Sequence, residues 1–211
     1  MASQLPDLQQ ALVQASTPGV FEITQTRPLP KLSANQVLVQ IAAVAVSPSD
    51  WKIPTHFPCP GAGTGSDFAG TVIQLGPDLI PATSSVKVGD RVAGAIFGSN
   101  PLEPQAGAFA EFMAISADLI WRLPNSMGFP DAASIGLSSV GTVGLAAFHE
   151  RHLNLPGSPE RPFSGGAAGM APWVLVYGGS TASGTVAIQI LKLCEPTPLL
   201  ACPSTHWHQR R

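Results

Sequence analysis

The chain has 211 residues, with 11 basic and 13 acidic side chains and a formal net charge of −2. This balance offers no basic surface to a polyanion, which argues against nucleic acid as a partner. No run of about 18 apolar residues predicts a membrane span, and residues 1–10 lack the basic and apolar regions of a secretory signal. We therefore expect a cytoplasmic protein with no membrane association.

Short apolar segments broken by Pro, Gly and Asp fill residues 19–121. Four of them read as strands bounded by turn residues, namely 37–47, 67–76, 89–98 and 107–116. Their irregular spacing argues against a repeat protein, whereas several strands joined by long connections favour a partly open β-barrel. We assign this barrel domain to residues 1–130.

The pattern changes after residue 130. Residues 131–152 contain few helix breakers other than Gly and predict a helix, with Asp131 in its N-terminal turn. Residues 155–172 are dense in Pro and Gly and predict an exposed loop. Residues 173–177 are a β-rich run of the kind that is buried on both faces of a parallel sheet. The apolar spacing that follows predicts a helix packed on that sheet.

A glycine turn joins this strand to this helix. Gly178 and Gly179 let the chain turn tightly and approach a ligand without a Cβ in the way. Three hydroxyl side chains stand where the helix begins, and together with backbone N–H groups they could hold a phosphate near the positive end of the helix dipole: Ser180, Thr181 and Ser183. The spacing is G-x-x-T-x-x-G rather than G-x-G-x-x-G, so a plain strand-to-helix turn without a ligand is the alternative interpretation.

Six segments carry a family resemblance in chain order: VLVQIAAVAVSPSDWK, GTGSDFAGTVIQLG, VGDRVAG, GAFAEF, FPDAASIGLSSVGTVGLAAF and VLVYGGSTASG. Together they resemble the medium-chain dehydrogenase/reductase superfamily, and more narrowly the zinc-free, trans-acting enoyl reductases of fungal polyketide synthases and polyketide-peptide hybrid synthases. The resemblance implies an α/β (α+β) architecture, in which a GroES-like, partly open β-barrel is followed by a truncated Rossmann fold at residues 131–211.

The same resemblance implies an activity and its partners. The expected reaction is NADPH-dependent hydride transfer to the α,β-unsaturated acyl thioester of a growing polyketide, in secondary-metabolite biosynthesis. The implied partner is the acyl carrier domain of a polyketide synthase or hybrid synthase, and we expect a monomer. NADPH supplies the hydride chemistry, so the protein's task is to position the acyl chain and to stabilise charge on the thioester oxygen.

The resemblance also implies that the site holds no metal. Zinc-dependent relatives carry a cysteine near the position of Ser47 and a His-Glu pair where Ser66 and Asp67 stand. A catalytic zinc needs three protein ligands drawn from Cys, His and carboxylates. Serine hydroxyls do not supply them, so we expect a zinc-free site.

Individual roles follow from the resemblance. The cofactor-binding residues are Ser49, Asp50, Trp51 and Lys52 for the nicotinamide half, Gly178, Gly179, Ser180, Thr181, Ala182 and Ser183 at the glycine turn, and Ser204 for the 2′-phosphate. The substrate-binding residues are Gly136, Leu137, Ser138, Ser139, Val140, Gly141, Thr142 and Val143.

Two of these residues are expected to be catalytic. The Lys52 ammonium could hold a ribose hydroxyl or the developing enolate oxygen, and Thr142 could donate to the carboxamide or the thioester carbonyl. Their alternatives are a surface lysine after a turn and a stretch of small residues that serves close packing alone. Tyr177 is the single tyrosine, and because it lies in the predicted buried strand we expect no tyrosine proton donor.

The chain departs from the family after the glycine turn, where a complete member continues much further. We therefore expect a C-terminally shortened form that leaves apolar residues such as Val186 and Ile190 uncovered. Because a dinucleotide straddles both halves of a Rossmann sheet, we expect NADPH binding to be weak or absent unless a second chain completes the sheet. Two alternatives stay open: a zinc-free quinone or alkenal oxidoreductase, and a non-catalytic remnant whose barrel binds a synthase.

Overall fold

The computed structural model describes residues 5–79, 85–164, 173–194 and 199–202. The chain divides into two compact units, residues 1–137 and residues 138–211, and each is considered by itself. Within the described ranges, no helix is long and apolar enough to cross a membrane.

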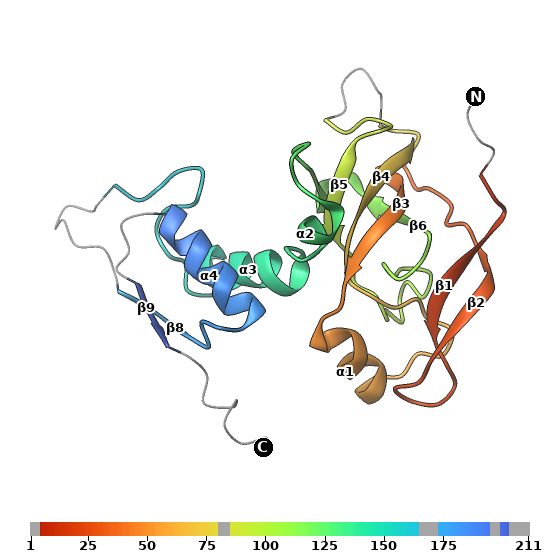
Figure 1. The fold of residues 1–211 in the computed structure, drawn as a ribbon, viewed down its shortest axis with the longest axis horizontal. Helices are drawn as coiled ribbons and strands as arrows, with labels where there is room; N and C mark the ends of the chain where they lie inside the picture. Colours follow the sequence, from red (N-terminus) through yellow and green to blue (C-terminus); the bar gives the residue numbers. More distant parts are fainter. Residues whose placement is uncertain (1–4, 80–84, 165–172, 195–198, 203–211) are drawn as a thin grey trace. The chain divides into compact units, whose positions relative to one another are not determined.

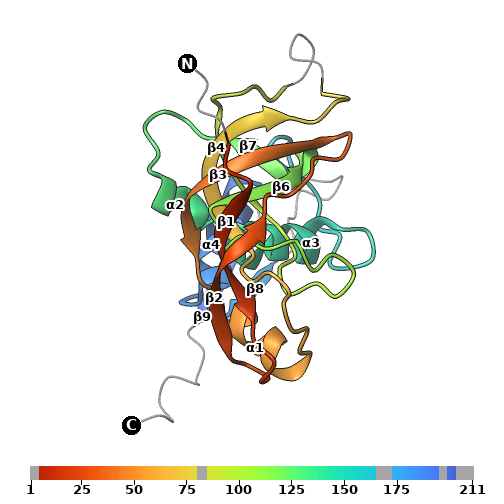
Figure 2. The same ribbon diagram turned by 90° about the vertical axis from the view of Figure 1, so that its right-hand side faces the viewer.

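The first unit is built on antiparallel strands (Figure 1). Its elements are β1 (Leu8–Gln14), β2 (Phe21–Pro28), β3 (Gln36–Ala45), α1 (Pro48–His56), β4 (Asp67–Leu75), β5 (Arg91–Ala95), β6 (Phe112–Ser116), a 3-10 turn (Ala117–Leu119), β7 (Ile120–Arg122) and α2 (Phe129–Ala133). Five strands form one sheet in the order β6-β3-β4-β5-β7, and β1 pairs with β2. The long neighbours β3 and β4 lie side by side in both views (Figure 2).

Isolated bridges join β1 to two loops of the barrel, at Ala11 with Ala110 and at Val13 with Gly63. The architecture confirms the predicted GroES-like, partly open barrel, and each of the four predicted strands is present in shorter form. The predicted ranges are wider because they include turn residues that flank the strands.

The core of the barrel is formed by side chains at alternate positions of these strands. Fully buried members include Val37 and Val39 of β3, Phe68 and Val72 of β4, and Val92 of β5. Each such side chain contributes roughly 1.5–3 kcal/mol through its burial. The barrel is therefore a rigid support for α1, which follows β3 directly.

The predicted continuous helix over residues 131–152 is wrong. The structure breaks it into α2, a π-helical turn (Leu137–Gly141) and α3 (Thr142–Phe148), although Asp131 does lie in the first turn of α2. Gly136 lies between α2 and the π-helical turn, and a Cβ on it would overlap the Asp67 carboxylate. Each Gly also costs a helix up to about 1 kcal/mol relative to Ala, so the glycines of this stretch favour the breaks.

The second unit contains the predicted strand, glycine turn and helix. β8 (Val174–Tyr177) is followed by α4 (Ala182–Leu193), and β9 (Leu199–Cys202) pairs with β8 in parallel. α4 packs against α3, β8 and β9. This order is that of the opening of a Rossmann fold, as expected.

Burial in this unit differs from the sequence-based expectation. β8 is not buried on both faces: Leu175 is 64% exposed and Tyr177 is 60% exposed. The expectation that Tyr177 is buried is therefore wrong. Among the described residues β8 has one strand neighbour and one covered face, which is the face toward α4. Val186 and Ile190, expected to be uncovered, are half-buried.

Candidate functional site

The turn between β8 and α4 is held by hydrogen bonds within the chain. Gly178 has φ +82°, in the left-handed region that favours glycine. Its carbonyl accepts hydrogen bonds from the Thr181 backbone N–H and from the Thr181 hydroxyl, both at 2.9 Å. The same hydroxyl accepts from the Gly184 N–H at 3.1 Å, which makes Thr181 the N-cap of α4.

Gly184 allows the helix to lie close to the turn. A Cβ at this position would overlap the Gly178 carbonyl oxygen and would lie 2.9 Å from the Cα of Gly179. The frame formed by Gly178, Thr181 and Gly184 is therefore required for packing alone, whether or not a ligand binds. Sequence reasoning missed this use of Thr181, whose hydroxyl hydrogen is donated to the turn. The S/T signal of an N-cap three residues before Gly184 could have indicated it.

The same geometry suits an anion. α4 has 12 residues, no acidic side chain in its first turn and Lys192 in its last turn, so its positive end faces the glycine turn without a competing carboxylate. Ser180 and Ala182 are exposed and Ser183 is half-buried. The turn can therefore present backbone N–H groups and the Ser180 hydroxyl to a phosphate.

α1 carries the second predicted segment, in the first unit. Ser47 is the N-cap and Pro48 takes the first helical position, where its missing N–H costs nothing. Trp51 and Lys52 are exposed, and the Lys52 ammonium lies 5.6 Å from the centroid of the Trp51 ring. This is the geometry of a cation–π contact, which holds the ammonium beside a flat apolar surface.

Asp50, which precedes these two residues in α1, is buried. Its Oδ2 accepts a hydrogen bond from the Ser47 N–H at 2.7 Å, and its Oδ1 accepts from the Ser66 hydroxyl at 3.1 Å. The three residues are 7–8% exposed. The Ser-x-x-Asp spacing is the signal of an N-terminal capping interaction that sequence reasoning could have used.

The donor set at these positions does not fit zinc. Ser47 and Ser66 offer hydroxyl groups, and that of Ser66 is already donated to Asp50. Zinc sites use thiolate, imidazole and carboxylate ligands. Over the described ranges, no cluster of three or more His, Cys, Asp or Glu residues could hold a metal ion.

The third predicted segment is divided between the two units. Gly136 belongs to the first unit, packed against Asp67, while Ser139 and Val143 are buried in the second unit at 1% and 6% exposure. Val140 and Thr142 are exposed. The side chains of Leu137 and Ser138 lie outside the described structure, as does residue Ser204.

The second unit brings part of this segment together with the glycine turn. Thr142 and Val143 line the same cavity as Thr181, Ser183 and Gly184. The cavity has a volume of about 290 Å³ and lies among α3, α4 and β8. Two segments that are far apart in sequence and were assigned to one site therefore border a common space.

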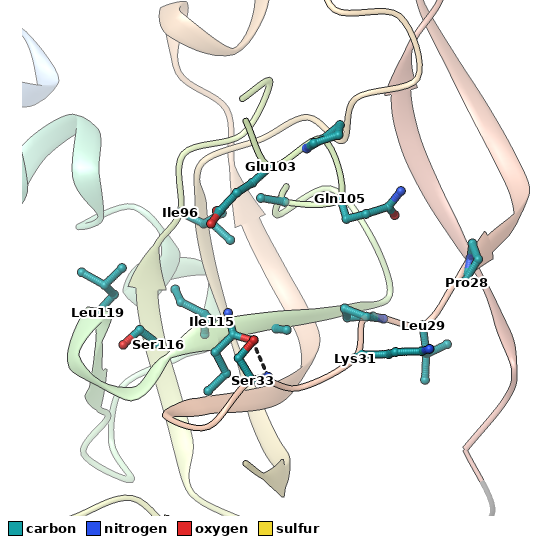
Figure 3. Close-up of a pocket in the computed structure, with 15 residues that line it drawn as sticks. Pro28, Leu29, Lys31, Ser33, Ile96, Glu103, Gln105, Ile115, Ser116 and Leu119 are labelled. Carbon is teal, nitrogen blue, oxygen red and sulfur yellow. Dashed lines mark hydrogen bonds between the residues drawn. The ribbon is translucent and has the colours of Figure 1, made fainter. Parts of the chain in front are cut away.

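A larger cavity, of about 640 Å³, lies in the first unit and contains none of the predicted site residues (Figure 3). Its walls come from the β2–β3 connection with Lys31, the loop with Glu103, and β6 with Ile115. The Ser33 N–H donates to the side-chain oxygen of Gln36 at 2.9 Å on one wall. The charged residues that line this cavity, Lys31 and Glu103, are both exposed.

Comparisons with known proteins agree with this architecture. The family model of the alcohol dehydrogenase GroES-like domain matches residues 33–125. The chain is 64% identical over 199 residues to the trans-enoyl reductase mycC of Thermothelomyces thermophilus, a match that covers 94% of this chain and 54% of that protein. It thus spans about half the length of the curated relatives it matches.

Solved structures of oxidoreductases have a similar fold. The chain is similar to an alcohol dehydrogenase superfamily protein from Novosphingobium aromaticivorans, with a TM-score of 0.72 and 28% identity over 94% of this chain and 54% of that one. It is also similar to the quinone oxidoreductase from Coxiella burnetii, with a TM-score of 0.65 and 25% identity over 95% of this chain and 58% of that one.

Proposed function

The chain belongs to the medium-chain dehydrogenase/reductase superfamily as a homologue of the fungal trans-enoyl reductases, and from this premise we propose that it provides the barrel and the phosphate-binding turn of an NADPH-dependent enoyl reductase. The substrate in this proposal is an α,β-unsaturated acyl thioester presented by the acyl carrier domain of a polyketide synthase. The 64% identity to mycC over 199 residues carries the proposal. NADPH, when bound, supplies the hydride that reduces the double bond.

The glycine turn is proposed to hold the cofactor's phosphates. Gly178 is buried and its positive φ shapes the turn, Gly179 is half-buried and has no Cβ, and the positive end of α4 favours the negative charge. Ser180 adds an exposed hydroxyl. Thr181 contributes indirectly, because the hydrogen bonds of its backbone N–H and its hydroxyl fix the shape of the turn.

Trp51 and Lys52 are proposed to contact the nicotinamide half. The exposed indole supplies a flat apolar surface, and the ammonium over it is a hydrogen-bond donor for a ribose hydroxyl or for negative charge on the thioester oxygen. Thr142, exposed at the start of α3, is proposed to donate a hydrogen bond to the thioester carbonyl. In this proposal these donors stabilise the charge without a metal ion, since Ser47 and Ser66 do not fit zinc.

The proposal is tested with a chimera, because the chain covers 54% of mycC. Residues 5–194 of this chain replace the matching region of mycC, and reduction of a short enoyl thioester is followed by the loss of NADPH absorbance. The proposal expects thioester turnover with NADPH by the chimera. It expects weak or no NADPH binding by the chain alone, so micromolar affinity of the monomeric chain contradicts that part.

A quinone or alkenal oxidoreductase is the second candidate, favoured by the likeness to the Coxiella burnetii quinone oxidoreductase. Quinone turnover by the same chimera without thioester turnover favours this candidate. Retained binding to an acyl carrier domain with loss of both activities favours the third reading, a non-catalytic remnant that binds a synthase.

A further inference from the structure

The start of α1 is fastened to the barrel through one buried carboxylate. Asp50 uses both oxygens: Oδ2 accepts from the Ser47 N–H at 2.7 Å and Oδ1 accepts from the Ser66 hydroxyl at 3.1 Å. The first bond lies within the helix terminus. The second joins α1 to the residue that precedes β4, and it bridges 16 residues of chain.

Ser66 is a fixed anchor for this bond. It is 7% exposed, and its backbone carbonyl accepts a hydrogen bond at 2.9 Å from the N–H of Ile96, the residue after β5. The other half of α1 has a separate attachment, since the Pro54 carbonyl accepts from the Gly19 N–H at 3.3 Å. Among the described residues, the Asp50–Ser66 hydrogen bond is therefore the polar contact that fixes the N-terminal half of α1 to the barrel.

That half of the helix carries two exposed side chains, Trp51 and Lys52. α1 has nine residues, which is too short for a stable isolated helix in water, and the ring of Pro54 removes one internal hydrogen bond. Its orientation must therefore come from attachments to the barrel. Burial of a carboxylate costs free energy because the group loses water. When a hydrogen bond no longer offsets that cost, the side chain is driven toward solvent.

We propose that Asp50 and Ser66 are positioning residues that hold Trp51 and Lys52 in the orientation from which they contact the cofactor. Of the pair, Ser66 stands where the family resemblance places a metal ligand in zinc-dependent relatives, and here its hydroxyl donates to the Asp50 carboxylate. The cofactor contact rests on the function proposed above, whereas the orientation of Trp51 does not. The two claims therefore fail independently.

The experiment uses the full chain labelled with 5-fluorotryptophan, without cofactor or substrate. The fluorine resonance of Trp51 is assigned from its absence in Trp51→Phe, and hydrogen–deuterium exchange is followed in the α1 peptide. In Ser66→Ala, the Trp51 resonance shifts or broadens, and α1 amides exchange about 10- to 100-fold faster, the range expected for loss of one hydrogen bond to a charged group.

Thr64→Val is the matched control. Thr64 is 1% exposed, lies two residues before Ser66 and donates its hydroxyl to the carbonyl of Leu12 in β1, not in α1, at 3.0 Å. This variant loses one buried hydrogen bond but leaves the Trp51 resonance and the α1 exchange rate unchanged. Ser66→Thr keeps the hydroxyl and restores both signals toward those of the parent chain.

Asp50→Ala provides a second variant if Ser66→Ala does not fold; it removes the acceptor of both hydrogen bonds and therefore changes the Trp51 resonance in the same way. Unchanged Trp51 resonance and α1 exchange in either folded variant overturn the proposal. An equal effect of Thr64→Val overturns it as well, because the signals then report general loss of stability. The Ser66→Ala substitution is also made in the chimera. If the Trp51 resonance changes and NADPH turnover is lost, the full proposal is supported. If the Trp51 resonance changes and turnover is unaltered, the link from the orientation of Trp51 to function is refuted.

Discussion

Replacement of Gly184 by Ala tests whether the glycine turn is built as the structure shows. The added Cβ would overlap the carbonyl oxygen of Gly178 and lie 2.9 Å from the Cα of Gly179. These are backbone atoms, which cannot rotate out of the way as the end of a side chain can. Either α4 must move off the turn, or the turn must open.

The expected cost combines three terms. Overpacking against fixed atoms costs about 1–3 kcal/mol, and displacement of the Gly178 carbonyl weakens two hydrogen bonds from Thr181, worth about 0.5–1.5 kcal/mol each. The higher helix propensity of Ala returns up to about 1 kcal/mol. The net loss is about 2–3 kcal/mol, which corresponds to roughly 30- to 150-fold faster amide exchange in α4.

Gly144→Ala is the control, since it lies in α3 of the same unit and a Cβ there meets nothing within 4 Å. This variant should gain up to about 1 kcal/mol from helix propensity alone. Hydrogen–deuterium exchange of the α4 and α3 peptides, read by mass spectrometry, measures both effects locally. The reasoning is refuted if Gly184→Ala protects α4 as well as the parent chain does, or if Gly144→Ala loosens the unit equally.

Three further predictions follow from single positions. Thr181→Ala removes the N-cap of α4 and should cost about 1 kcal/mol, with Thr181→Ser near the parent value; equal α4 exchange in both would contradict the cap. Gly65→Ala should unfold the barrel at a much lower temperature than Gly61→Ala, because both have positive φ but only at Gly65 does the Cβ overlap an aromatic ring; similar melting temperatures would be inconsistent with this. Burial raises the pKa of the Cys194 thiol, which keeps it protonated to higher pH, so iodoacetamide at pH 8 should modify half-buried Cys59 before Cys194, and peptide mapping that finds the reverse order of these two rejects this.

Local sequence signals predicted much of this structure. Strands β3, β4, β5 and β6 and the β8–turn–α4 unit follow from alternation, apolar spacing and Gly or Pro boundaries, which depend on neighbours along the chain. The break at Gly136 depends on the distant Asp67 carboxylate, which no local pattern reveals. The exposure of Tyr177 depends on which strands lie beside β8, so residue type alone suggested the wrong burial.

Site residues were predicted by type and position, but their hydrogen bonds were not. The sequence pattern predicts that the Thr181 hydroxyl contacts a phosphate, whereas in the structure this hydroxyl closes the turn. Asp50 was grouped with the cofactor-binding residues, and the structure gives its carboxylate two partners inside the barrel unit. Such assignments need three-dimensional distances, because a hydroxyl or carboxylate has the same sequence signature in either role. The division of the chain into domains at residue 130 stays a prediction.

The most direct test of the account is NADPH binding by the mycC chimera, followed by hydrogen–deuterium exchange with and without saturating cofactor. The account predicts that NADPH slows exchange in the peptides that contain Gly178 to Thr185 and Ser49 to Lys52. It also predicts that the chimera binds NADPH more tightly than the chain alone does. A folded chimera that binds NADPH but protects instead the cavity near Lys31 and Glu103, or protects neither segment, would contradict it.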